Sequence, residues 1–355
     1  MVDRRTSSMR GLSRVPSAYR CLLQTILSLA VLGGAGAPAF GAGFQTEQSP
    51  KKGAKESAEE ARRQHEVGRQ TLPQLTAEEK QRIESAIPKT AQARPKRKRK
   101  VLVVTLNKWD GIERRGHTSI PYGNLAIQSM GQRTGAYEAV FSNDVNMFRP
   151  ANLKQFDAIL FNNTGGVLTD DPVLRESLLN FVRKGKGFVG LHAAGATFVQ
   201  YPVYDQFPAF GDMLGGYEDG GHPWGPKDVI TMKVEDPQNP VNAAFGGQSF
   251  EISDEVFQFR APYSREKLHI LLSVDTDRTD MNPKRHFLPA RATDHDFGMS
   301  WIHRYGKGRV FYSSFGHNPE IFWNAPMLQH FLAGIQYALG DLKADDRPSA
   351  VIAKR

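Results

Sequence analysis

Residues 187–196, GFVGLHAAGA, constrain the fold of this chain more than any other segment. A short apolar run ends at His192, and small residues follow it at once. This pattern is typical of a buried strand that ends in a tight turn and raises one reactive side chain at its carboxyl end. Open α/β sheets bind their ligands at the edge that the carboxyl ends of their strands form. Enzymes built around such a turn usually carry Ser or Cys at its tip, so the histidine predicts acid–base chemistry or metal ligation rather than acyl transfer.

Apolar runs of strand length alternate with helical segments along the chain. Strands are expected at 101–107, 137–143, 157–166, 187–192, 229–234 and 249–259. Helices are expected at 122–135, 170–185 and 325–341, and a hairpin at 297–318. Continuous apolar strands separated by helices indicate a parallel sheet that is covered on both faces. The predicted fold class is therefore α/β, with a mostly parallel central sheet between two layers of helices.

Residues 1–39 have the features of a secretory signal peptide. Five arginines and one acid precede the apolar run CLLQTILSLAVLGGAG, and Ala37-Pro38-Ala39 forms an A-x-A cleavage site. We therefore expect an exported protein of a bacterial periplasm or the extracellular medium, with an uncleaved membrane anchor as the alternative. The only cysteine, Cys21, lies in this segment, so removing it excludes disulfides and a thiolate nucleophile.

The positive charge of the chain is concentrated in residues 1–100, which carry 20 Lys and Arg against 9 Asp and Glu. The remainder carries 26 against 28, so nucleic-acid binding has no electrostatic basis there. Residues 40–99 are charged and poor in aromatic side chains, which predicts a mostly disordered linker. A capping box at Thr76 and Glu79 predicts a short helix near 76–87 within it. The domain is expected at 100–341, followed by a flexible tail at 342–355.

Four histidines lie at predicted strand ends or in glycine-rich loops, namely His117, His192, His222 and His317. In a doubly wound sheet, the loops that hold the first, second and fourth of these fall at the carboxyl edge, so their side chains could converge. No spacing such as H-x-x-x-H supports a metal site. No cofactor is therefore predicted outright, and a divalent metal stays open as an alternative.

Asp254 and Glu255 stand side by side among aromatic and β-branched residues. Successive strand residues point to opposite faces, so one of the two carboxylates would face the pocket and act as a general acid or base. The alternative is a loop carboxylate that pairs with Arg260 or Arg265. With His192, these two acids are the catalytic candidates.

Aromatic rings near polar groups favour a pocket for sugars, whose apolar faces stack on flat rings. Trp224, between Pro and Gly in a polar loop, is the ring assigned to binding, and asparagines would bond hydroxyls. The residues expected to bind substrate are His117, His222, Trp224, His317, Asn318 and Asn163.

Several segments occur in an order that resembles the ThuA-like (trehalose utilisation) family. They are the first strand with its following histidine, GFVGLHAA, GGHPW, ISDEVFQF and GKGRVFYSSFGHN, and the resemblance covers about residues 100–341. It implies the flavodoxin-like three-layer sandwich of the class I glutamine amidotransferase-like superfamily, and a role in the metabolism of disaccharides or their 3-keto derivatives. True amidotransferases use a cysteine nucleophile where this chain has His192, so glutaminase activity is not expected.

These observations predict an exported protein that acts on a glycoside or 3-keto-glycoside by histidine and carboxylate acid–base chemistry. The class of enzyme stays open between isomerase, lyase and hydrolase. A non-catalytic carbohydrate-binding protein and a metal-dependent hydrolase are the alternatives. The expected partner is a small carbohydrate rather than a nucleic acid, and a homo-oligomer stays open.

Overall fold

The structure is a computed structural model that describes residues 71–201, 206–219 and 221–352. The predicted signal peptide and residues 40–70 of the predicted linker lie outside the described residues. Within the described part of the chain, no helix is long and apolar enough to cross a membrane.

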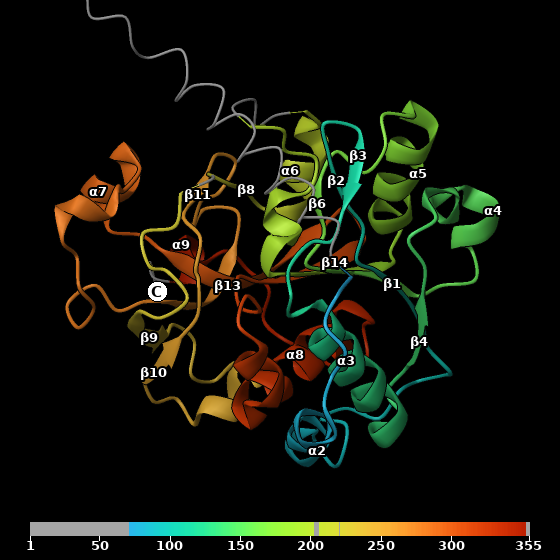
Figure 1. Cartoon of the computed structure of the whole chain (residues 1–355), viewed down its shortest axis with the longest axis horizontal. Coiled ribbons are helices and arrows are strands. Elements are labelled where there is room, and N and C mark those ends of the chain that lie inside the picture. Colours follow the sequence, from blue (N-terminus) through green and yellow to red (C-terminus); the bar gives the residue numbers. More distant parts are fainter. Residues whose placement is uncertain (1–70, 202–205, 220, 353–355) are drawn as a thin grey trace, which may run out of the picture. The chain divides into compact units, whose positions relative to one another are not determined.

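A nine-stranded sheet with the order β10-β9-β12-β13-β14-β7-β5-β1-β4 forms the centre of the fold (Figure 1). The five strands from β14 to β4 run parallel, and the other four extend the sheet antiparallel. Strands β5 and β7 are buried at every position, as expected for strands covered on both faces. The strands are β1 (Lys100–Val104), β4 (Glu138–Phe141), β5 (Ala158–Asn162), β7 (Gly187–Leu191), β9 (Val229–Val234), β10 (Phe250–Ser253), β12 (His269–Val274), β13 (Gly298–Tyr305) and β14 (Gly308–Ser313).

Helices cover both faces of this sheet, and each layer closes its own apolar core (Figure 1). One layer contains α2 (Ala77–Ala86), α3 (Ile120–Thr134) and α8 (Ala325–Ala338). The other contains α4 (Pro150–Leu153), α5 (Pro172–Arg183) and α6 (Pro208–Leu214). The predicted three-layer α/β fold with a largely parallel sheet is therefore confirmed, and so is the hairpin that β13 and β14 form.

Two small sheets lie beyond the ends of the central strands and carry loops of the site. A three-stranded sheet joins β2 (Asn107–Trp109), β3 (Ile112–Arg114) and β6 (Gly165–Gly166). A two-stranded sheet joins β8 (Tyr217–Glu218) and β11 (Phe259–Arg260). The strand expected at 249–259 is present only in part, because β10 ends at Ser253 and residues 254–258 form a connecting segment before β11.

Residues 71–99, expected to be mostly disordered, instead lie against the domain. The predicted capping box at Thr76 is present and starts α2, whose Ile83 is fully buried. Farther on, the backbone N–H of Gln92 donates to the side chain of Gln336 on α8 at 2.9 Å. Arg99 donates to the Asp341 carboxylate at 2.6 Å. Composition alone did not reveal these contacts, because their partners lie more than two hundred residues away in the sequence.

The carboxyl-terminal segment also has fixed partners as far as the structure describes it. It contains α9 (Ser349–Ile352), and the Ser349 backbone N–H donates to the Leu268 carbonyl at 2.9 Å. The Ser349 hydroxyl accepts from the Ile270 N–H at 2.9 Å. The described part of the predicted flexible tail, 342–352, is therefore attached to the antiparallel half of the sheet. The remaining short helix, α7 (Pro289–Asp294), follows β12.

His330 on α8 provides a test of this core. The ring is fully buried, and its Nδ1 lies 2.9 Å from the Val241 carbonyl oxygen. Burial lowers the pKa of His330 to about 4. As the pH falls from about 6.5 to about 4, the unfolded chain binds a proton that the folded chain does not, so this ring removes up to about 3 kcal/mol from the free energy of unfolding.

The variant His330→Gln should lose less stability on acidification than the unmodified protein. Urea unfolding of both proteins at about pH 7 and about pH 4.5 measures the difference. An equal loss in both proteins would contradict this account of the ring.

Candidate functional site

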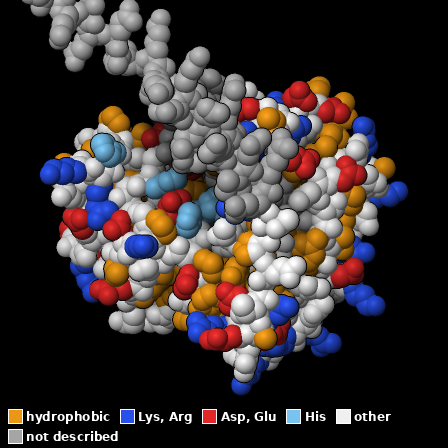
Figure 2. Space-filling model, in the orientation of Figure 1, with side chains coloured by type: hydrophobic (Ala, Val, Ile, Leu, Met, Phe, Trp, Pro, Cys, Tyr) orange, Lys and Arg blue, Asp and Glu red, His pale blue; other side chains and the backbone are white. Residues whose placement is uncertain are grey.

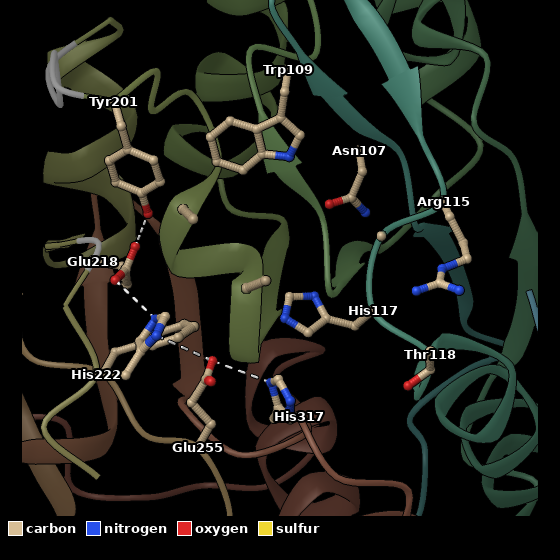
Figure 3. A pocket seen from close by; sticks show the side chains of 14 residues that line it. Asn107, Trp109, Arg115, His117, Thr118, Tyr201, Glu218, His222, Glu255 and His317 are labelled. Atoms are coloured by element: carbon tan, nitrogen blue, oxygen red, sulfur yellow. Dashed lines mark hydrogen bonds and ion pairs between the residues drawn. The ribbon is translucent and has the colours of Figure 1, made fainter. Parts of the chain in front are cut away.

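A cavity of about 440 Å³ opens at the carboxyl ends of the neighbouring strands β7 and β14. Figure 2 shows histidine and acidic side chains side by side in a hollow of this face. The side chains around the cavity are drawn in Figure 3. Its polar and aromatic lining includes Asn107, Trp109, Arg115, His117, Tyr201, Glu218, His222, Glu255, Phe257 and His317.

His192 occupies the turn directly after β7, where the sequence predicts it. Its backbone φ is +46°, a conformation that costs a residue with a side chain about 1–3 kcal/mol and is concentrated at functional sites. Two contacts hold it there: the Tyr312 hydroxyl donates to the His192 carbonyl at 2.7 Å, and the ring Nδ1 lies 2.7 Å from the Ser314 carbonyl oxygen. The predicted need for small residues is confirmed at Gly190, where a Cβ would come within 2.9 Å of the Tyr312 ring.

Two further imidazoles meet the fully buried His192 ring. His117 comes from the loop between β3 and α3, and His317 from the loop after β14. Their ring centroids lie 4.8 Å and 5.3 Å from that of His192. Phe257 closes the other side of the His192 ring, with the two centroids 4.4 Å apart. The predicted convergence of histidines at this edge of the sheet is therefore present.

The connecting segment after β10 brings the two candidate acids to the site in different ways. Asp254 is fully buried, and its carboxylate accepts backbone N–H groups of Gly316, His317 and Asn318 at 2.7 Å, 3.3 Å and 2.7 Å. Asp254 thus fixes the loop that carries His317 and lies outside the cavity lining. Glu255 points into the cavity. Neither acid pairs with Arg260 or Arg265, which bind Asp219, Glu235 and Asp296 instead.

A chain of polar contacts runs across the cavity floor from Tyr201 to His317 (Figure 3). The Tyr201 hydroxyl donates to Glu218. The other Glu218 oxygen lies 3.3 Å from His222 Nε2, and His222 Nδ1 lies 3.5 Å from Glu255. Glu255 in turn lies 3.2 Å from His317 Nδ1. Acids and imidazoles therefore alternate along this chain of contacts.

The groups of this chain differ in their affinity for protons. Burial and the neighbouring His317 lower the pKa of His117 to about 4, and burial places the pKa of His192 well below its ordinary value. Burial also lowers the pKa of His222, but the hydrogen bond with Glu218 and the charge of Glu255 outweigh it, so the net shift is upward. For Glu255, burial is outweighed by His317 and His222, and the pKa lies below its usual range. A charged carboxylate therefore lies beside a protonatable imidazole.

Aromatic side chains form one wall of the cavity. The Trp109 and Tyr201 rings stack with their centroids 5.5 Å apart and an angle of 16° between their planes. Both side chains line the cavity and lie above its polar floor (Figure 3). Such a wall can bind the apolar face of a sugar ring, and the volume is within the range of about 300–1,000 Å³ typical of small-molecule sites.

Three residues expected to bind substrate are not in this cavity. Trp224 is fully buried in the core, where its Nε1 donates to the Asp280 carbonyl at 3.0 Å, because the polar loop around it folds inward. Asn163 is also buried, and its amide donates to the Gly316 carbonyl. The Asn318 amide donates to the Pro226 and Ser253 carbonyls and faces a neighbouring depression. These three side chains stabilise the loops of the site instead.

Glu218 is the functional candidate that the sequence prediction missed. It is almost fully buried, yet it contacts both Tyr201 and His222. Its position four residues before His222, in EDGGH, was the available signal. The segment has no helical pattern that would predict this contact, and the two residues meet just after β8.

The fold and the site define a flavodoxin-like α/β protein with a pocket of histidines and carboxylates at the carboxyl edge of its parallel strands. A model of the ThuA family, described as trehalose utilisation, matches residues 100–338. The chain therefore belongs to the ThuA family, as its motifs predicted. Membership of this family indicates a role in sugar metabolism.

The chain is similar to several solved structures, of which the first below supports the fold. A ThuA-like protein from Bacteroides uniformis ATCC 8492 is 19% identical, with a TM-score of 0.51 over 71% of this chain and 94% of its own. A ThuA-like protein from Parabacteroides merdae ATCC 43184 is 14% identical, with a TM-score of 0.48 over 71% and 95%. A β-galactosidase from Bacillus circulans sp. alkalophilus is 12% identical, with a TM-score of 0.42 over 72% and 32%. No curated protein matches the chain.

Proposed function

We propose that this protein is a sugar-processing enzyme that acts on a glycoside or 3-keto-glycoside by acid–base chemistry. The observation that carries the proposal is the position of Glu255 between His222 and His317 in a cavity with an aromatic wall. A structural ion pair has no need of an open cavity, whereas a catalytic pair does. The family's description as trehalose utilisation supports a sugar as the substrate.

Glu255 is the base in this proposal. A keto group on a sugar ring acidifies the neighbouring C–H bond, so a carboxylate can remove that proton. When the proton leaves the carbon between the keto group and the anomeric centre, the electron pair of the C–H bond first forms an enolate. The keto group then re-forms, and a C=C bond forms between the deprotonated carbon and the anomeric carbon. At the same time the glycosidic C–O bond breaks. No oxidant or reductant is needed.

His222 is the acid that completes this step. Its raised pKa keeps the ring protonated at higher pH than an ordinary histidine, and Glu218 behind it stabilises the charged form. The proton of His222 would pass to the oxygen that leaves the anomeric carbon, which releases a free alcohol. The ring of His222 is partly exposed, so it can meet both the substrate and solvent. In this scheme His192 does not touch substrate, since its side chain is fully buried.

The proposal is tested by following deuterium. In D₂O, the 3-keto-glycoside that remains should exchange the hydrogen on the carbon between its keto group and its anomeric centre for deuterium. This exchange occurs when the enolate takes up a deuteron before the glycosidic bond breaks, and NMR measures it. The matched glycoside without the keto group should take up no deuterium. Binding of sugars without exchange or turnover, over a panel of glycosides and 3-keto-glycosides, would instead make the protein a carbohydrate-binding protein.

We further propose that the protein is exported. The arginines before the apolar run and the site at Ala37-Pro38-Ala39 support this. Expression of the full chain in a Gram-negative bacterium should give a periplasmic protein that begins at Phe40, as determined by amino-terminal sequencing. A full-length chain in the membrane fraction would instead indicate an anchor, and a full-length soluble chain would end the proposal of export.

A further inference from the structure

Three imidazole rings surround a single point at the bottom of the cavity. The ring centroids of His117, His192 and His317 lie 4.8 Å, 5.1 Å and 5.3 Å apart in pairs. The angles between the ring planes are 86°, 81° and 83°, so each ring is nearly perpendicular to the other two. Aromatic rings that only pack together also favour edge-to-face angles, so the hydrogen bonding of the ring nitrogens decides whether this arrangement fits an ion.

One nitrogen atom of each of the three rings lacks a hydrogen bond. Among the described residues, His117 Nδ1, His192 Nε2 and His317 Nδ1 are all buried side-chain atoms without one. The Glu255 oxygen 3.2 Å from His317 Nδ1 forms an ion-pair contact there but lies outside hydrogen-bond geometry. Buried polar atoms in proteins are almost always satisfied by protein groups, water or an ion. Two buried nitrogens without a partner, beside a third whose contact is the Glu255 carboxylate, therefore leave a place for one shared partner, either a water molecule or an ion.

His192 shows which sign of charge an ion at this place would carry. Its Nδ1 lies 2.7 Å from the Ser314 carbonyl oxygen, which can only accept, so Nδ1 carries the hydrogen. Nε2, which lies 3.9 Å from a Glu255 oxygen, consequently presents a lone pair. An anion would require a donor at this position, whereas a cation requires a lone pair. A backbone carbonyl behind a ring nitrogen is also the usual arrangement for a metal-binding histidine.

We infer that His117, His192 and His317 bind one divalent transition-metal ion, with the Glu255 carboxylate facing its open coordination position. One ligand atom from each of the four residues lies within 4.8 Å of the others. Zinc sites with three protein ligands and an open fourth position use nitrogen ligands at about 2.0–2.1 Å, so the rings would move slightly inward on binding. Imidazole favours Zn²⁺, Ni²⁺ and Cu²⁺ over the oxygen-seeking Mg²⁺ and Ca²⁺. An ion here could also polarise a substrate carbonyl.

The metal assignment is tested without any sugar, so its outcome is separate from that of the proposed enzyme activity. The full chain, freed of metal by a chelator, is titrated with Zn²⁺ against a chromophoric competitor. We expect one Zn²⁺ per chain, no competition from Mg²⁺, and visible absorption bands when Co²⁺ replaces Zn²⁺. Weak binding without a fixed stoichiometry would overturn the assignment.

Variants identify the ligands. His192→Ala and His117→Gln should each lose stoichiometric Zn²⁺ and the Co²⁺ bands. The second variant changes a partly exposed side chain, so it keeps the test valid if the first does not fold. His222→Gln is the matched control, because its ring lies in the same cavity but outside this group of three rings, and it should retain one Zn²⁺. An equal loss of Zn²⁺ in the control would show that the three rings are not the ligand set.

Discussion

Replacing Glu255 with glutamine is expected to lower turnover of a 3-keto-glycoside by about 10²–10⁴-fold, the usual contribution of a general base. Glutamine has nearly the same shape but cannot take up a proton. The side chain is held at the cavity between His222 and His317, so removing its charge should leave the fold in place. Steady-state rates, together with circular dichroism of the variant, measure the effect.

The matched control is Glu251→Gln, which makes the same chemical change at an exposed position of β10. It should keep full turnover. The variant Glu255→Gln should also retain one Zn²⁺ per chain, since the proposed ligands are the three rings. Normal turnover in Glu255→Gln would remove Glu255 from the role of base, whereas loss of Zn²⁺ along with turnover would make it a ligand.

The central fold could be predicted because its strands are buried on both faces. Strands such as β5 and β7 are nearly continuous apolar runs of five residues, a pattern typical of parallel strands between two layers of helices. The segment 249–259 has a similar composition, yet it divides at Asp254. The Asp254 carboxylate accepts hydrogen bonds from three N–H groups of a distant loop. These hydrogen bonds outweigh the local preference of the segment for a continuous strand.

The site could be predicted only where topology fixed it. His192 and His317 follow adjacent parallel strands, so their meeting was a consequence of the sheet order. Trp224 was misplaced because a tryptophan in a polar loop can turn either outward to a ligand or inward to the core, and the sequence does not distinguish the two. Glu218 was missed for a related reason: its contacts with Tyr201 and His222 depend on how an irregular segment folds.

The variant Asp254→Asn should impair the site more than the fold. Asp254 accepts three N–H groups from residues 316–318, and an asparagine would turn an NH₂ group toward at least one of these donors. Burial raises the pKa of Asp254 to about 7, which shows that the buried charge is costly. Removing this charge therefore offsets part of the stability lost with the hydrogen bonds. We expect the free energy of unfolding to fall by only about 1–3 kcal/mol.

Function should respond more strongly, because the loop that Asp254 holds carries His317. Loss of a group that orients a metal ligand typically costs about 10–100-fold in affinity or activity, and we expect this loss in both Zn²⁺ affinity and kcat. The exposed Asp277→Asn is the control for the chemical change. The decisive readout is kcat and Zn²⁺ affinity of the folded fraction at a temperature well below unfolding. If both are normal there while stability is reduced, Asp254 supports the fold alone, because a positioning residue must change the chemistry of molecules that are still folded.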